Sequence, residues 1–582
     1  MAWKRITAFA AVAALGVASC GSPSGSSGNN SGNEIKNDAQ AQVADAAAKG
    51  PAKPVDGAKK GGTMTILSDV TPGTMDPTNT YYVDGSAIQK LFFRALTQYD
   101  IRNGAPVLVP DLAEDLGKES EDGLSWTFKL KKGIKYHDGT PVKAEDYAYA
   151  IKRSFAHEIF SDGPAYQLAY FKDHDKYKGP YAAGGDAYAG VETPDDSTLV
   201  IKLDKPWKDL PYYVSFPLFT PIPKAKDTRQ NYEKAPLATG PYMVKSYAPG
   251  TELKLTKNPN WDPNTDPVRL QNVDNWVFKF GLDPVKVQRQ VIASSGPDAS
   301  ALNYSNLDST LLPLITDQNK DQLVKGAGNC QVFWTMDSRK VPIEVRRAIA
   351  AAYPYNALRK ISGHTDFADP PASTILPAAV PGYEKFEIPG LNGKGDGDPA
   401  KAKEMLKAAG KEGFELSWYY SNDDNIATQV SQARAQALEK AGFKTKPIGV
   451  PQANIRKLTG DQNGPVNMGK APAGWCSDWP SPTSWFSVLF KSQAIAEGNS
   501  VGQLENKELD AEIDRVEAMD PAEALKNKEW SKLDRKILEE YLPALPIRTS
   551  NVAFVVGKNI GNPEVDTAFG MPHFVRMFLK QP

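Results

Sequence analysis

Strand-like and helix-like segments alternate along the chain from residue 61 onward, and this alternation constrains the fold more than any other feature of the sequence. Residues 125–130 and 199–203 alternate apolar and polar side chains, as half-buried strands do. Apolar residues recur at helical spacing in 143–155, and 399–409 begins as helices do, with proline in the first position. Strands interleaved with helices predict an α/β protein.

Length and composition narrow the class further. The chain has 582 residues, against roughly 100–200 for a typical domain, so two or three lobes are expected. The formal net charge is -1, which leaves no basic field for nucleic acid. After the N-terminal segment, no apolar run approaches the roughly 20 residues that span a bilayer, so the body is not expected to cross the membrane.

The N-terminus has the features of an export signal. Lys4 and Arg5 precede an apolar run at 8–18, and small residues lead to Cys20. We expect residues 1–19 to be a removable signal peptide and Cys20 to carry a lipid. In the alternative, the signal is cleaved in the ordinary way and Cys20 is incidental.

Residues 20–60 are expected to form a flexible, lipid-anchored linker. Segment 21–32 is almost entirely Gly, Ser, Asn and Pro, and segment 33–60 contains no aromatic residue. Such a composition cannot bury enough apolar surface to offset the entropy lost on ordering. The globular body is therefore expected to begin at about residue 61.

If Cys20 carries lipid, Cys330 and Cys476 are the remaining cysteines. In an oxidising compartment an even pair is most simply a disulfide, and the alternative is two buried free thiols. Two distant cysteines in a chain with only five histidines make a poor metal site, so no metal is expected.

Several motifs carry a family resemblance. The sequence contains PDLAE at 110–114, WTFKLKKGIKYHDGTPV at 126–142, AED at 144–146 and KR at 152–153. This region resembles the signature region of the peptide-binding family of solute receptors that serve ABC importers. Further family-like motifs follow in the same order, with TGPY at 239–242, VRRAI at 345–349, DPAKA at 398–402 and LPI at 545–547.

The resemblance implies a two-lobed α/β fold of the periplasmic-binding-protein type (class II, cluster C), with an extra inserted lobe and the ligand cleft between the lobes. The expected N-terminal lobe is discontinuous and comprises 61–93, 190–329 and 550–582. Residues 94–189 are expected to form the inserted lobe, and 330–549 the C-terminal lobe.

The resemblance also implies a ligand site in the segment GWCSDWPSPTSW at 474–485. Asp478 matches the family residue that pairs with a peptide's α-ammonium group, a role that suits a carboxylate because an unpaired buried ion is costly. Trp475 and Trp479 would supply apolar walls for side chains of varied shape. In the alternative, Asp478 caps a turn and the tryptophans belong to the core. Cys330 and Cys476 fall where the oligopeptide receptors of this family place their disulfide.

The chain departs from the family pattern at two positions. Where the long-peptide receptors have an arginine three residues before the tryptophan that matches Trp475, this chain has Pro472. A cation for a peptide's carboxyl end is therefore missing, and Arg456 or Lys457 is a candidate substitute. Pro354 lies where the family helix usually continues, and it is expected to redirect the chain.

Signs of catalysis are weak. The sequence has no phosphate-binding loop, no His-Glu-x-x-His motif and no Gly-x-Ser-x-Gly elbow. His137 and Asp138 form a conceivable catalytic pair, but they lie in a turn that the family commonly has for structural reasons. We expect a binding protein without a cofactor rather than an enzyme.

These features predict a lipoprotein receptor on the outer face of the cell membrane. It would act as a monomer, capture short peptides and deliver them to an ABC permease with its ATPase subunits, without binding nucleic acid. The alternatives are the same architecture with another solute, such as a metal chelate, sugar or haem, or else a secreted hydrolase or a surface signalling protein.

Overall fold

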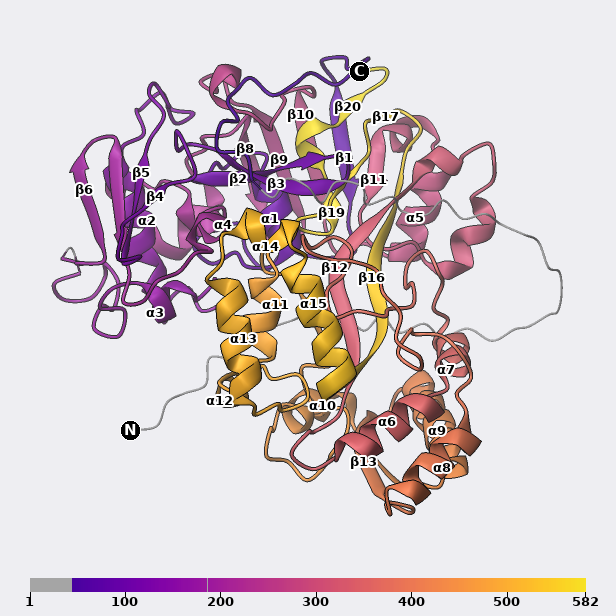
Figure 1. The fold of residues 1–582 in the computed structure, drawn as a ribbon. Helices are drawn as coiled ribbons and strands as arrows, with labels where there is room; N and C mark the ends of the chain where they lie inside the picture. Colours follow the sequence, from indigo (N-terminus) through magenta and orange to yellow (C-terminus); the bar gives the residue numbers. More distant parts are fainter. Residues whose placement is uncertain (1–43, 186) are drawn as a thin grey trace. The chain divides into compact units, whose positions relative to one another are not determined.

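The computed structural model describes residues 44–185 and 187–582, which form two compact units (Figure 1). Among the described residues, the first unit is one continuous segment, Ala327–Asn551. The second contains the described residues up to Gly326 together with Val552–Pro582. Both boundaries fall inside strands, within β12 (Leu323–Thr335) and β16 (Ala544–Val556). The chain therefore passes from one unit to the other through two strands.

A mixed sheet forms the centre of the second unit, with the strand order β16-β11-β1-β10-β9-β8. β1 (Thr63–Leu67) is parallel to its neighbours β10 (Asn275–Lys279) and β11 (Ala301–Asn303). β9 (Glu252–Lys257) and β8 (Tyr242–Ala248) extend the sheet in antiparallel order. This mixture of parallel and antiparallel strands, with helices along the chain between them, confirms the α/β class.

The segment from β4 to β7 forms a separate sheet of order β4-β5-β7-β6. Trp126 and Phe128 of β5 are buried opposite Ile201 and Leu199 of β7, as the alternation in the sequence predicts. The remaining strands of the second unit are β2 (Thr97–Arg102), β3 (Ala105–Pro110), β4 (Lys118–Glu119), β5 (Ser125–Lys129), β6 (Val191–Asp195), β7 (Thr198–Lys202), β17 (Ile560–Gly561), β18 (Val565–Asp566), β19 (Met571–Pro572) and β20 (Phe578–Leu579). Its α-helices are α1 (Val83–Gln89), α2 (Ala144–Ser154), α3 (Gln167–Tyr170), α4 (Leu210–Tyr213) and α5 (Pro284–Ala293).

The PDLAE motif has a structural role, because Asp111 lies in a buried cluster of four charges. Asp111 accepts from Arg94 Nε at 2.7 Å and from Arg269 Nη2 at 2.8 Å. Asp266 lies 3.2 Å from Arg269 and completes the cluster. Two carboxylates and two guanidinium groups balance each other's charge, which is the condition for burying ions at a tolerable free-energy cost.

The turn at His137 and Asp138 is also structural. His137 Nδ1 accepts from the backbone N–H of Ala238 at 2.9 Å, and the His137 carbonyl oxygen accepts from Asn260 Nδ2. Asp138 accepts from the N–H of Thr140 at 3.0 Å. Both side chains therefore have hydrogen bonds that hold the turn and its neighbours together.

Several contacts join residues ahead of position 61 to the rest of the second unit. Asp45 donates its N–H to the carbonyl of Leu108 and forms an ion pair with Arg102 at 2.9 Å. Ala52 is buried, and the carbonyl of Lys53 accepts from Arg576. The composition of this segment gives no sign of these contacts, because polar and backbone contacts leave no apolar pattern in the sequence. The expected signal peptide, Cys20 and the first part of the linker lie outside the described residues.

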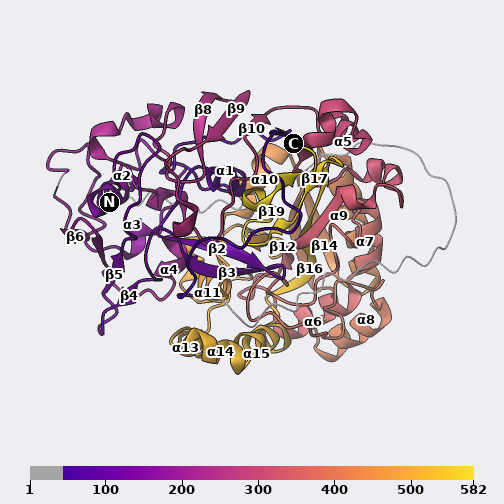
Figure 2. The same ribbon diagram turned by 90° about the horizontal axis from the view of Figure 1, so that it is seen from above.

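The first unit contains two strand groups and most of the long helices. Its other strands are β13 (Glu415–Ser421), β14 (Lys444–Val450) and β15 (Gly474–Cys476). Its helices are α6 (Ile343–Ala352), α7 (Tyr355–Ser362), α8 (Pro399–Ala408), α9 (Asn425–Lys440), α10 (Gln452–Thr459), α11 (Thr483–Leu489), α12 (Ala494–Glu497), α13 (Lys507–Glu517), α14 (Pro521–Lys526) and α15 (Glu529–Lys536). Figure 2 shows α13, α14 and α15 side by side.

The core of the first unit explains two sequence features. β13 and β14 are parallel and are connected by α9, whose Ser431 accepts from the buried Trp418 Nε1 at 2.9 Å. α6 ends at Ala352 and α7 begins at Tyr355, so Pro354 does redirect the chain. Among the described residues, no helix is both long and apolar enough to cross a membrane.

Asp534 on α15 is a buried carboxyl group that holds a distant loop in place. Its oxygens accept from the backbone N–H groups of Ile375 at 2.9 Å and Leu376 at 3.0 Å. Burial raises the pKa of Asp534 to about 7, although these two N–H groups oppose the shift.

We predict that Asp534 lowers the stability of the protein as the pH rises. An unfolded aspartate loses its proton near pH 4, whereas the folded one keeps it up to about pH 7. The free energy of unfolding should therefore fall across this window, by at most about 1.4 kcal/mol per pH unit. Between pH 5 and pH 7, urea unfolding should therefore show a more unfavourable change in stability for the wild type than for Asp534→Asn. The exposed Asp317→Asn is the control, and equal pH dependence in wild type and Asp534→Asn would contradict the assignment.

Candidate functional site

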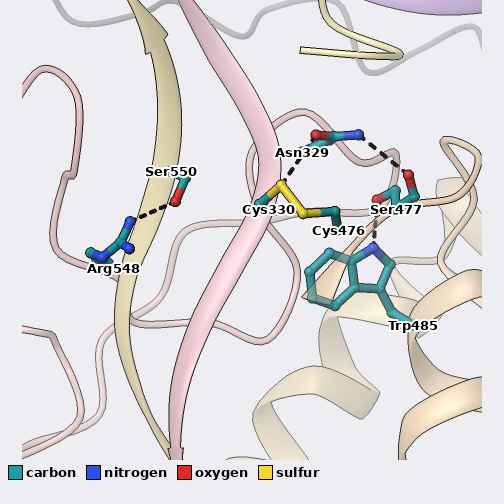
Figure 3. The surroundings of a disulfide bond; sticks show 7 residues. All are labelled: Asn329, Cys330, Cys476, Ser477, Trp485, Arg548 and Ser550. Atoms are coloured by element: carbon teal, nitrogen blue, oxygen red, sulfur yellow. Dashed lines mark hydrogen bonds between the residues drawn. A yellow bond between two sulfur atoms is a disulfide. The ribbon is translucent and has the colours of Figure 1, made fainter. Parts of the chain in front are cut away.

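The candidate segment, residues 474–485, begins with β15, which pairs antiparallel with β12. The register places Cys330 opposite Cys476, Gln331 opposite Trp475 and Val332 opposite Gly474. Cys330 and Cys476 form a disulfide with Cα atoms 4.0 Å apart, so the pairing named from the sequence is present (Figure 3). Chain pairing continues past the disulfide, where Ser477 donates its N–H to the carbonyl of Asn329 at 3.0 Å.

Burial alternates along both strands and defines two faces of this part of the sheet. On β12, Asn329, Gln331 and Phe333 are buried, whereas Cys330 and Val332 are half-buried. Opposite them, Trp475 and Ser477 are buried, whereas Cys476 and Asp478 are half-buried. Since successive strand side chains point to opposite faces, one face packs inward and the side chains of the other are partly exposed. We call the second one the open face.

Side chains of the buried face hold the segment in position. Trp475 belongs to the core of the first unit, and its Nε1–H donates to the carbonyl of Ser484 at 3.0 Å. Trp485 Nε1 donates to Ser477 Oγ at 2.6 Å, and Asn329 Nδ2 donates to the Ser477 carbonyl (Figure 3). Trp475 therefore supports the strand from behind, and its direct contact with a ligand stays a prediction.

Asp478 and Trp479 follow directly after this anchored strand. Asp478 is half-buried and continues the alternation of the open face. Trp479 is 4% exposed, and its carbonyl accepts from the N–H of Ser481 and from Ser484 Oγ. The turn that follows is thus fixed by backbone hydrogen bonds, so Asp478 extends from a rigid support.

The two cations named from the sequence lie on α10. Arg456 and Lys457 are exposed, and α10 has no buried residue. Sequence reasoning did not single out Arg548, which lies on β16 beside β12. Arg548 and Ser550 are two residues apart in a strand, so the sequence could have placed them on the same face. Which face this is depends on the neighbouring strand, which the sequence does not identify.

The described residues contain no group of three or more His, Cys, Asp or Glu side chains arranged to hold a metal ion. The charged side chain that the candidate segment leaves partly exposed is Asp478, whereas Trp475 and Trp479 are buried.

Comparison with known proteins identifies the class. The sequence model of bacterial extracellular solute-binding proteins, family 5 Middle, matches residues 107–497. The chain belongs to this family, whose members are binding proteins rather than enzymes and act outside the cytoplasm.

The chain is also similar to individual proteins. The chain is 26% identical to a di/tripeptide-binding protein 1 of Pseudomonas aeruginosa, over 88% of this chain and 93% of that protein. It is 25% identical to heme-binding protein A of Haemophilus influenzae, over 78% and 80%. Among solved structures, it resembles clavulanic acid biosynthesis oligopeptide binding protein 2, with a TM-score of 0.78, 25% identity and coverage of 92% of this chain and 99% of that one.

We predict that the disulfide contributes strongly to the stability of the first unit. It joins residues 146 positions apart, and the chain-entropy estimate for such a loop is about 5 kcal/mol, an upper figure. The Cys330→Ala, Cys476→Ala double variant should therefore unfold at a clearly lower urea concentration than the wild type. Thiol titration of denatured, unreduced wild type should detect neither cysteine, and two reactive thiols would refute the bond.

Proposed function

We propose that this protein captures short peptides outside the membrane and delivers them to an ABC permease energised by ATPase subunits. Asp478 is the residue that binds the α-ammonium group of the peptide. The observation that carries the proposal is the position of this carboxylate on the open face, directly after a strand fixed by a disulfide and by buried hydrogen bonds.

A rigid carboxylate suits this ligand for a physical reason. An ammonium group taken out of water needs an anionic partner, and the charge-assisted hydrogen bond is short and strong. A support that is already ordered saves the entropy of arranging the partner when the ligand arrives. The backbone of β15 and the adjoining turn supply such a support through Trp475, Ser477 and Ser484.

The relatives support peptides as the ligand class but do not decide it. A di/tripeptide-binding protein and a heme-binding protein both align with most of the chain. Because one fold serves both ligands, the site must decide between them. The carboxylate at Asp478 favours a ligand with a positive end, which a peptide has.

The peptide assignment is tested by a double-mutant cycle. Asp478→Asn should weaken the binding of trialanine by on the order of 100-fold, because the ammonium group loses its ionic partner. N-acetylation of the peptide should weaken binding to the wild type by a similar factor. The two changes together should cost much less than their sum, since both remove one interaction.

Calorimetry on both proteins with both peptides completes the cycle, and the exposed Asp317→Asn is the matched control. Equal affinity of the wild type for free and acetylated trialanine would refute the role of Asp478. Absence of any peptide binding to the folded wild type would refute the peptide ligand itself.

We also propose that a lipid on Cys20 anchors the protein to the outer face of the membrane. Replacing Cys20 by alanine should abolish fatty-acid labelling and release the protein into the medium, because each buried CH₂ of a lipid contributes about 0.8 kcal/mol. Fractionation of cells expressing each form measures this. Retention of the variant on the membrane would refute the anchor.

A further inference from the structure

Arg548 lies on the same open face as Asp478. The strand order β15-β12-β16 places β16 on the other side of β12 from β15. Thr549 Oγ1 donates to Gln331 Oε1 at 2.6 Å, so Thr549 shares the buried face with Gln331. Its neighbours Arg548 and Ser550 therefore point to the opposite face, to which Cys330, Cys476 and Asp478 belong. Figure 3 shows Arg548 and Ser550 on β16, next to the strand that carries Cys330.

The guanidinium group of Arg548 is oriented but has capacity to bind a further anion. Nη1 donates to Asp369 Oδ1 at 2.6 Å and to Ser550 Oγ. Among the residues that the structure describes, Nε and Nη2 make no hydrogen bond, and the side chain is 16% exposed. A planar guanidinium group held at one nitrogen can still present a fork of two donors to a carboxylate.

Two guanidinium groups, those of Arg548 and Arg359, lie beside the partly buried Asp369. Asp369 also faces His364 Nδ1 at 3.3 Å, and its backbone carbonyl accepts from Arg359. The partner of Arg359, Asp366, is 90% exposed and so is screened by water. Burial lowers the pKa of Arg548, the charge of Asp369 opposes this shift, and the charge of Arg359 adds to it. An additional negative charge would therefore be stabilised here.

We infer that Arg548 binds the carboxylate end of the peptide whose ammonium end meets Asp478. The inference rests on the proposed function and supplies the cation that Pro472 leaves missing. Two strand spacings separate β15 from β16, which is about 10 Å across the sheet. The proposed ligand therefore carries a positive and a negative group that can reach across these strands, as the two ends of a short peptide can.

The competing candidates fit this role less well. Arg456 and Lys457 are exposed on α10, and a cation in water gains little from one more ion pair. Arg548, in contrast, is mostly buried and is held by Asp369 and Ser550, so it presents its donors in a fixed direction.

The test compares trialanine with its C-terminal amide by calorimetry. Wild type should bind the free acid about 10- to 100-fold more tightly than the amide, since the amide cannot form the charge-assisted pair. Arg548→Gln should bind the two peptides with nearly equal affinity, and Arg548→Lys should restore part of the preference. The ratio of the two peptides' affinities is unaffected by a general loss of stability. It therefore distinguishes a role of Arg548 in ligand recognition from a role in packing.

Arg456→Gln and Lys457→Gln are the matched variants, and both should keep the wild-type ratio. Loss of the ratio in either of them, or its persistence in Arg548→Gln, overturns the inference. If Arg548→Gln does not fold, the wild type and Arg548→Lys still test the inference. Equal binding of the free acid and the amide by the wild type overturns the inference. A preference of the wild type for the free acid that is smaller in Arg548→Lys supports it. Binding of both peptides without preference leaves the proposed function intact, whereas binding of neither refutes the proposed function itself.

Discussion

The pairing of β12 with β15 on one side and β16 on the other is the constraint on which the candidate site depends. It brings together three segments that are distant in the sequence, those around Cys330, Cys476 and Arg548. One set of side chains anchors the sheet to the core through Trp475 and Gln331. The alternate set is left on the open face, where opposite charges can be presented at a fixed separation.

Much of the regular structure follows from local pattern. The expected strand at 125–130 corresponds to β5, and the expected helices at 143–155 and 399–409 correspond to α2 and α8 within one or two residues. The apolar residues of these elements recur with a clear period and the residues at their ends are typical of strand and helix ends. Their secondary structure can therefore be predicted without knowing which elements pack against them. The family, and the disulfide that it implies, also followed from motifs in the sequence.

What the sequence could not provide is adjacency between strands. The proposed role of Arg548 depends on the position of β16 beside β12, and no local sequence pattern indicates that these two strands are neighbours. The composition of residues 44–60 gives no sign of their contacts for a similar reason, since these contacts are polar and distant in the chain. Conversely, Asp111 and His137 stand out in the sequence, and the structure uses both for internal bonding.

The position of the two unit boundaries has a consequence for the order of folding. In the part of the chain that the structure describes, the first unit is uninterrupted, so all of its strands and both cysteines are present once residue 551 has emerged, whether from the ribosome or from an export channel. The second unit begins earlier but needs the end of β16 and the C-terminal residues to complete its sheet. Since domains fold as units when their segments are available, the part of the body that is synthesised first is completed last.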